Sequence, residues 1–344
     1  MFTGNGSIIK DVLALSCDTI PDRIFCRDDQ MNGVLNNLKP VLKGINGRSM
    51  FLHGPPGSGK TCISRHVLGE FEMQASGVKT VYINCWENPS RFKILYKLME
   101  QMGMVLSVHR KGMPTDELTE ALAKKLEGKK AVFVLDEVDQ LEDGKVLYDL
   151  MLIPGLCLVM IANDEDVFSR LDPRIMSRLA MLDRIKFPQY GQSELAEILK
   201  DRADLGLMPG VVKRNQLERI ANASSGDARV AINMLRIIAE SAENDDLMKI
   251  SDYYVEKVMQ NSMAGLREKA ACGFNQYQQF ILQILKKNKN MDSTALFAAV
   301  SAAAAEKKLE PIVDRTFRNY MDKLISANYV SVSGNGRWRV FSLA

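Results

Sequence analysis

The clearest chemical signal is a glycine-rich segment that ends in Lys and Thr, Gly54-Pro55-Pro56-Gly57-Ser58-Gly59-Lys60-Thr61. It follows a predicted strand, 50–53, and precedes a predicted helix, 61–71, the setting in which G-x-x-x-x-G-K-[ST] wraps phosphate. Backbone N–H groups of such a loop point at phosphate oxygens, and the helix N-terminus adds partial positive charge. We expect Lys60 to reach the β- and γ-phosphates and Thr61 to ligate Mg²⁺. The predicted nucleotide-binding set here is Gly54, Pro55, Pro56, Gly57, Ser58, Gly59, Lys60, Thr61 and Cys62.

A second signal lies at the end of the apolar run 131–135, which predicts a strand buried on both faces of a parallel sheet. Two carboxylates follow, Asp136 and Glu137. Asp136 is placed to hold Mg²⁺ and Glu137 to polarise an attacking water, the tasks that phosphoryl transfer leaves to acidic residues. The alternative is a charged strand terminus that caps a helix, and the upstream phosphate loop favours catalysis.

Three further polar residues are candidates for catalysis. Asn163 directly follows a predicted strand, 156–162, and would orient the attacking water if that strand lies beside the strand of Asp136. An Asn in this position is equally typical of a turn or a helix N-cap. Arg178 and Arg229 would each supply positive charge to the transition state, or else form surface ion pairs.

Length and composition limit the class of protein. A chain of 344 residues predicts two or three domains. No apolar stretch approaches the ~20 residues of a membrane span, and the N-terminus lacks a basic region before an apolar core, so we expect a cytoplasmic protein without a membrane partner. The six cysteines form no C-x-x-C and predict reduced thiols. With only three histidines, Mg²⁺ brought by the nucleotide is the metal implied.

The order of predicted elements divides the chain into three domains. The predicted strands 50–53, 79–84, 131–135 and 156–162 alternate with helices up to Phe187-Pro188-Gln189-Tyr190, which predicts an α/β domain with a parallel sheet and ligands at the strands' carboxyl ends. A purely helical region follows. From about Gly265, three helices (276–287, 293–308, 312–327) and two β-prone runs around an Asn-Gly turn predict a winged helix. The expected domains are 1–189, 190–264 and 265–344.

Charge is unevenly divided along the chain. The last 80 residues carry 12 Lys or Arg and six Asp or Glu, a net charge of +6, whereas the net charge of the whole chain is +3. This segregation indicates a polyanionic partner such as nucleic acid, the alternatives being a solvated surface or a winged helix that contacts protein. The helix 312–327 would enter the major groove of double-stranded DNA, and residues beside the hairpin tip would reach phosphates or a minor groove. The predicted DNA-binding residues of this domain are Arg315, Thr316, Arg318, Arg337 and Arg339.

Several strings together resemble the AAA+ replication-initiator family, the group of origin recognition complex subunit one and cell division control protein six, most closely its archaeal, single-chain form. The strings are GPPGSGKT (54–61), VFVLDEVDQL (132–141), IAND (161–164), LDPRIMSRL (171–179), FPQY (187–190) and SGDARVAINMLR (225–236). The resemblance covers nearly the whole chain. It implies a P-loop AAA+ domain, a helical lid and a C-terminal winged helix.

The resemblance also implies roles for particular residues. Asn163 would be the sensor at its strand end, and Arg229 the lid sensor that touches the γ-phosphate. Arg178, with Arg174 as the alternative, would be the finger offered to a neighbouring subunit's nucleotide. Residues 21–27 would line the adenine pocket, with Pro21 and Arg23 among them. A helical insertion between Cys85 and about Gly112 would contact DNA through Arg91, Lys93 and Lys97.

The function implied by this resemblance is an ATP-dependent initiator of DNA replication. It would bind duplex origin DNA, use the ATP or ADP state and slow hydrolysis as a switch, and recruit a replicative helicase. It would also self-associate or join paralogous initiator subunits. We expect it in the nucleoid if the source is archaeal and in the nucleus if it is eukaryotic. One alternative is a clamp-loader-like or other AAA+ DNA-remodelling ATPase, with a helical collar in place of the wing. Another is a DNA-binding scaffold that holds nucleotide without hydrolysing it.

Overall fold

The computed structural model describes residues 7–75, 77–104, 114–260, 276–288, 290–307, 309, 312–326, 330–333 and 339–343. They belong to two compact units, Met1–Glu256 and Lys257–Ala344. The first unit contains the predicted α/β region and the predicted helical region as far as Glu256, and the predicted boundary at 264–265 lies outside the described residues.

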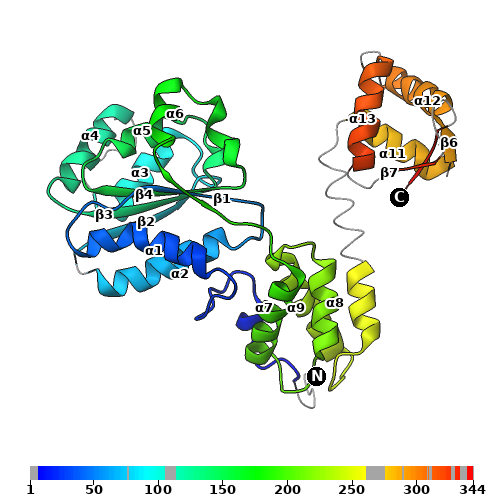
Figure 1. Ribbon diagram of the computed structural model, residues 1–344, viewed down its shortest axis with the longest axis horizontal. Coiled ribbons are helices and arrows are strands. Elements are labelled where there is room, and N and C mark those ends of the chain that lie inside the picture. Colours follow the sequence, from blue (N-terminus) through cyan, green and yellow to red (C-terminus); the bar gives the residue numbers. More distant parts are fainter. Residues whose placement is uncertain are drawn as a thin grey trace. The chain divides into compact units, whose positions relative to one another are not determined.

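A five-stranded parallel sheet forms the centre of the first unit (Figure 1). Its order is β2 (Lys79–Asn84), β3 (Ala131–Asp136), β4 (Leu156–Ala162), β1 (Met50–His53) and β5 (Asp183–Lys186). The first four were predicted from the sequence, whereas β5 was not. Register pairs Asn84 with Asp136 and His53 with Ala162, so the carboxyl ends of the central strands meet at one edge.

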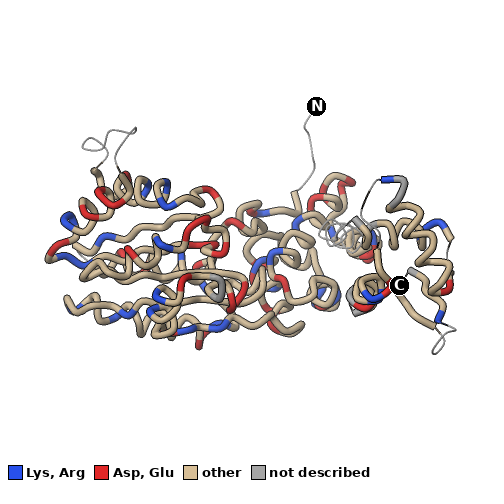
Figure 2. The backbone as a smooth tube through the Cα atoms, turned by 90° about the horizontal axis from the view of Figure 1, so that it is seen from above, with Lys and Arg blue, Asp and Glu red and all other residues tan. Residues whose placement is uncertain are grey.

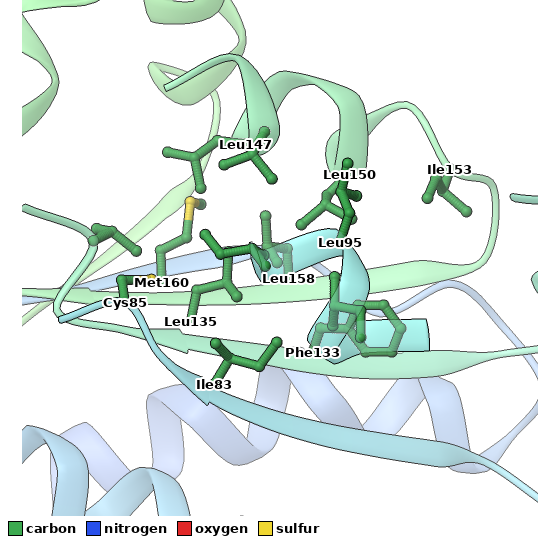
Figure 3. Packing of buried hydrophobic residues seen from close by; sticks show 14 of the residues in the cluster. Ile83, Cys85, Leu95, Phe133, Leu135, Leu147, Leu150, Ile153, Leu158 and Met160 are labelled. Atoms are coloured by element: carbon green, nitrogen blue, oxygen red, sulfur yellow. The ribbon is translucent and has the colours of Figure 1, made fainter. Parts of the chain in front are cut away.

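Helices cover both faces of this sheet, as predicted. On one face α1 (Asp28–Leu42) and α2 (Lys60–Gln74) pack with strand residues such as Leu52 and Val134. The other face carries α3 (Arg91–Gln101), α4 (Thr115–Leu126), α5 (Lys145–Met151) and α6 (Pro173–Leu179). Figure 3 shows Leu147 and Leu150 of α5 lying over the strand residues Leu135, Leu158 and Met160. All six residues of β3 are buried, which explains their continuous apolar run.

The rest of the first unit is helical and includes the N-terminal segment. Helices α7 (Gln192–Gly206), α8 (Arg214–Ala223) and α9 (Ala228–Asn244) pack together. Residues 252–260 are also helical, and the first unit ends within them, at Glu256. The short 3₁₀ helix η1 (Leu13–Leu15) lies on α7. Just before it, Ile9 pairs with Leu207 in an antiparallel bridge, and the N–H of Lys10 donates to the carbonyl of Gly206 at 2.8 Å. Residues 9–15 are thus fastened to α7 and to Leu207, which follows it.

The second unit has a winged-helix arrangement. Its helices are α11 (Gln276–Asn288), α12 (Ser293–Glu306) and α13 (Asp314–Ser326). A three-stranded antiparallel sheet in the order β6 (Asn290–Asp292), β8 (Val340–Leu343), β7 (Val330–Ser333) completes it. The predicted hairpin is present as β7 and β8, and β6 is an additional strand. A small core that includes Leu285, Val300, Phe317, Met321 and Phe341 holds the unit together.

Charged residues of both signs are interspersed along the backbone of the first unit (Figure 2). Among the described residues, no helix is both long and apolar enough to cross a bilayer. In the same part of the chain, Cys17, Cys26, Cys62, Cys85 and Cys157 are free thiols, and no group of three or more His, Cys, Asp or Glu is arranged to hold a metal ion.

Candidate nucleotide-binding site

The phosphate loop lies between β1 and α2 at the carboxyl edge of the sheet, and two of its glycines are required there by close packing. Gly54 has φ 146° and Gly57 has φ 71°, values that side chains rarely allow. A Cβ on Gly54 would lie 2.0 Å from the carbonyl oxygen of Phe187, and one on Gly57 would lie 1.9 Å from the carboxylate of Asp227. The loop is therefore held against the end of the α/β region and the start of α9.

Lys60 begins α2 and is 7% exposed. Its Nζ donates to the carbonyls of Gly54 at 2.6 Å and Pro55 at 2.9 Å, and to Oδ1 of Asn163 at 3.1 Å. Burial lowers the pKa of the Lys60 amine to about 8, although the charges of Asp136 and other carboxylates act in the opposite direction. This buried ammonium, with two partners in the loop and the third at the end of β4, lies beside the N-terminus of α2, where phosphate oxygens bind.

Asp136 ends β3 and accepts hydrogen bonds at both carboxylate oxygens. The hydroxyls of Thr61 and Tyr82 donate to its Oδ2 at 2.7 and 2.6 Å, and the N–H of Glu137 donates to its Oδ1 at 2.9 Å. Nearby, Oδ1 of Asp139 is buried without a hydrogen-bond partner among the described residues. Mg²⁺ takes hard oxygen ligands, so the Thr61 hydroxyl and the Asp136 carboxylate fit it.

Glu137 follows Asp136 with a left-handed backbone, φ 56° and ψ 47°, which is costly for a residue with a side chain. Burial and the neighbouring Asp136 charge raise the pKa of its carboxyl. A hydrogen bond from the Asn84 side chain acts in the opposite direction on that pKa. A carboxylate with a raised pKa and a fixed direction suits a general base.

Asn84 is a site residue that the sequence analysis missed. It ends β2 next to Asp136 in the sheet register, and its Oδ1 also accepts from the N–H of Trp86 at 2.8 Å. The available signal was its place at the end of a predicted strand, the feature that selected Asn163. Asn163 itself follows β4, which pairs with β3 as the analysis supposed.

A cavity of about 540 Å³ joins these groups to the N-terminal segment and the lid helices. Three regions line it: residues 17–25, the phosphate loop with the strand ends, and the helices α7 and α9. The lining residues from the predicted set are Pro21, Arg23, Pro56, Gly57, Gly59, Lys60, Thr61, Cys62, Asp136, Glu137, Asn163 and Arg229. A chamber with phosphate-binding groups at one side and apolar Ile20, Ile24 and Phe25 elsewhere is suited to a nucleotide.

Arg229 reaches this cavity from the first turn of α9. Asp227 caps that helix by accepting from the N–H groups of Arg229 at 2.8 Å and Val230 at 3.3 Å. The guanidinium is 61% exposed and lies 3.7 Å from the Asp227 carboxylate. Arg229 is therefore positioned by the helix cap but not fixed by burial.

Two buried arginines hold residues 14–27 in place: Arg202, which the sequence analysis did not select, and Arg27, the last residue of the predicted segment 21–27. Arg202 of α7 donates to the carbonyls of Ala14 at 3.1 Å and Thr19 at 3.0 Å. Arg27 donates to the carbonyl of Ser58 at 3.0 Å and that of Pro188 at 2.6 Å, with its guanidinium 3.6 Å above the ring centre of Tyr190. The segment that lines the cavity is thus fastened to the lid at one end and to the phosphate loop at the other.

Other predicted residues lie away from the cavity. Arg178 in α6 is exposed, with its guanidinium 5.0 Å from the ring centre of Tyr148, and does not line the cavity. Arg91 is 12% exposed and pairs with Asp149 and Asp116, so the expectation that it faces DNA does not fit this placement. Lys93 is exposed, and Lys97 pairs with Glu100 in the same helix.

The predicted DNA-binding residues of the second unit are partly described. Arg315 and Arg318 are exposed on α13, Thr316 is half-buried, and Arg339 is exposed just before β8. Arg318 pairs with Asp314 at 2.6 Å. Arg337 lies outside the described residues.

Comparison with known proteins agrees with this architecture. Residues 196–260 match the family model described as "Cdc6 AAA+ ATPase-type lid domain", and residues 45–167 match that described as "AAA domain". ORC1-type DNA replication protein 9 of Halobacterium salinarum is 32% identical over 337 residues, which cover 98% of this chain and 94% of the relative. ORC1-type DNA replication protein 1 of the same organism is 34% identical over 307 residues, 89% of this chain and 99% of the relative.

Solved structures share the fold. The Aeropyrum pernix ORC1 protein in complex with DNA is similar with a TM-score of 0.71 and 24% identity, covering 98% of this chain and 94% of that one. Cdc6p from Pyrobaculum aerophilum has a TM-score of 0.71 and 22% identity over the same shares. At these identities the structural likeness concerns the fold.

Proposed function

The chain belongs to the AAA+ replication-initiator family of ORC1- and Cdc6-type proteins, and from this premise we propose that it initiates DNA replication in an ATP-dependent manner. In this proposal, residues 1–189 are the ATPase core, 190–264 the lid and 265–344 the DNA-binding winged helix. One observation carries the proposal: a cavity that gathers Lys60, Thr61, Asp136, Glu137 and Arg229 occurs in the same chain as a winged helix.

We assign the nucleotide site to ATP and ADP, with Mg²⁺ as the metal. Lys60 and the loop N–H groups would bind the phosphates, and Thr61 with Asp136 would hold Mg²⁺, which would supply charge neutralisation at the phosphates. Glu137 accepts a proton from the attacking water, and Asn163 orients that water. Arg229 contacts the γ-phosphate from the lid. Arg178 acts on the nucleotide of a neighbouring copy or paralogue, consistent with its exposed position. Hydrolysis is slow, so the nucleotide state serves as a switch.

DNA binding is assigned to the second unit. Arg315 and Arg318 on α13, with Arg339 beside β8, would contact duplex origin DNA, and the ATP-bound state would recruit a replicative helicase. Lys93 and Lys97 remain proposed contacts from the first unit, whereas Arg91 is left out because two carboxylates already hold it. The clamp-loader alternative expects a helical collar, and the β6-β8-β7 sheet beside α11–α13 supports the initiator instead.

The test is binding of the purified protein to fragments of its own genome, with ATP, ADP or no nucleotide, at two salt concentrations. Phosphate contacts make any DNA binding salt-dependent, so the informative quantity is the ratio between the best fragment and bulk DNA. We expect one fragment to be preferred by at least ~10³-fold and the preference to depend on nucleotide. The matched control is Lys60→Ala, which should lose the nucleotide effect. Uniform binding would favour a remodelling ATPase or a scaffold, and absence of binding would overturn the DNA-reading role.

A further inference from the structure

Tyr82 touches the proposed metal site although no phosphate-loop or carboxylate motif includes it. It lies in the middle of β2, opposite Val134 of β3, and lines the cavity. Its hydroxyl donates to Oδ2 of Asp136 at 2.6 Å. The hydroxyl of Thr61 donates to the same oxygen at 2.7 Å. One carboxylate oxygen therefore receives two hydroxyl protons from two different elements, β2 and α2.

This arrangement sets the direction of the Thr61 oxygen. Because the single hydroxyl proton of Thr61 points at Asp136, its lone pairs are left for another partner. The N–H of Glu137 holds Oδ1 of Asp136 at 2.9 Å, so the carboxylate is held at both ends. Without the Tyr82 hydroxyl, Oδ2 would lose one of its two donors and the carboxylate would be freer to rotate.

The Tyr82 ring is itself held in place by packing. The Arg65 guanidinium lies over it, 4.4 Å from the ring centre. Arg65 comes from α2, one turn after Thr61, so the same helix supplies both the metal-binding hydroxyl and the group that packs on Tyr82.

We propose that Tyr82 is a positioning residue for Asp136 and thereby sets the affinity of the nucleotide complex for divalent cations. This inference rests on the proposed nucleotide function. It assigns Tyr82 no contact with the reacting atoms, and its effect on hydrolysis passes entirely through the metal. Partners that orient metal ligands typically change metal affinity by about 10–100-fold when they are removed.

The test uses Tyr82→Phe in the full chain, because this change removes one hydroxyl and keeps the ring beneath Arg65. Mn²⁺ binding to the nucleotide-loaded protein is followed by loss of the free-ion EPR signal, with Mg²⁺ as competitor, so the readout needs no turnover. We expect the dissociation constant for Mn²⁺ and Mg²⁺ to rise about 10–100-fold, while nucleotide affinity in EDTA stays within about twofold. The ATPase rate should recover at high Mg²⁺.

A matched control is available in the lid. The hydroxyl of Tyr254 also donates to a carboxylate, that of Asp245, but neither residue lines the cavity. Tyr254→Phe should leave metal affinity unchanged. Unchanged metal affinity in Tyr82→Phe, or an equal loss of nucleotide affinity in EDTA, would overturn the positioning role. If the wild-type protein itself binds no nucleotide, the proposed function fails instead, so the two failures are distinguishable.

Discussion

The amine of Lys60 is hydrogen-bonded to the side-chain oxygen of Asn163 at 3.1 Å, so the phosphate loop and the end of β4 are joined across the site. We expect Asn163→Ala to reduce the ATPase rate by about 10²-fold, because it removes a fixed polar group next to the reacting phosphate. The affinity for ATP should change by less than about fivefold, since Lys60 keeps two carbonyl partners. Single-turnover hydrolysis and equilibrium binding separate the two effects.

The control for this substitution is Asn222→Ala. Asn222 is an exposed amide in α8 whose side chain accepts from Gln192 and is not part of the cavity lining. Its removal should leave both the rate and the affinity unchanged. Equal rates for Asn163→Ala and wild type would show that Asn163 is only a structural strand-end residue.

The lowered pKa of Lys60 predicts a pH dependence of nucleotide affinity. Burial is the main cause, and the amine of the free protein titrates at about 8. Phosphate requires the protonated amine and raises its pKa, so affinity should be constant below about pH 7.5. Above pH 8 it should fall by up to about tenfold per pH unit, because binding must then take up a proton. Calorimetry in buffers of different ionisation enthalpy measures that proton uptake.

Lys60→Ala is the reference for this pH profile. Its affinity should be weaker and nearly independent of pH between 7 and 9.5. A wild-type profile as flat as that of the variant would contradict the assignment of the titrating group to Lys60.

Glu137→Gln tests whether hydrolysis occurs through the predicted base. The amide keeps the size of the side chain but cannot accept the proton from water, so the rate should fall by about 10²–10⁴-fold while ATP binding persists. With the wild-type carboxyl, the rate should fall on acidification with a midpoint above the ordinary value for Glu, because burial and Asp136 raise its pKa. Rate–pH profiles of both proteins provide the measurement. Indistinguishable ATPase rates and DNA-binding responses would support the non-hydrolysing scaffold.

Sequence patterns predicted those parts of the site that are local in the chain. The phosphate loop and the carboxylates after β3 are encoded within a few residues, and the apolar run of β3 reflects burial on both sheet faces. Tyr82 and Arg202 could not be selected in the same way, because their partners lie far away in the sequence; Tyr82 and Asp136 are 54 residues apart.

Two strands illustrate the same limit. In β5 only Ile185 is buried among four residues, so no apolar run marks it, and pairing with β1 makes it a strand. In β6, three mostly exposed residues become a strand only through β8, which lies near the C-terminus. Short edge strands depend on tertiary partners more than on their own composition.

The position of Arg202 predicts a loss of affinity restricted to the base side of the nucleotide. Arg202→Met keeps the apolar stem but removes the donors to the carbonyls of Ala14 and Thr19, so residues 17–25 should lose their fixed position. We expect the dissociation constant for ATP to rise about tenfold, a loss comparable to one or two net hydrogen bonds. Binding of inorganic tripolyphosphate should be unchanged, because Lys60 and its loop are untouched.

Arg236→Met is the matched control in the same lid. Arg236 of α9 pairs with Glu240 and does not line the cavity, so its loss should alter neither ligand. Parallel weakening of ATP and tripolyphosphate in Arg202→Met would indicate general destabilisation of the unit and contradict the specific role. Isothermal titration with both ligands decides between these outcomes.

The ion pair between Asp314 and Arg318 at the start of α13 predicts a substitution that strengthens DNA binding. Asp314 holds the Arg318 guanidinium at 2.6 Å, and both side chains are exposed. Asp314→Asn removes a negative charge that would face phosphates and frees Arg318, so affinity for duplex DNA at low salt should rise several-fold. The plot of log affinity against log salt should become steeper by up to about one unit, the effect of one additional phosphate contact.

Two variants complete this experiment. Glu218→Gln breaks a similar exposed pair with Arg214 in α8, outside the winged helix, and should leave DNA affinity unchanged. Arg315→Ala, on the same helix as Asp314, should weaken binding and make the salt dependence shallower by about one unit. Both expectations depend on α13 facing DNA. They would be contradicted if Asp314→Asn bound DNA no more tightly than Glu218→Gln and if Arg315→Ala kept the wild-type salt dependence. That result would show that another surface of the chain contacts the duplex.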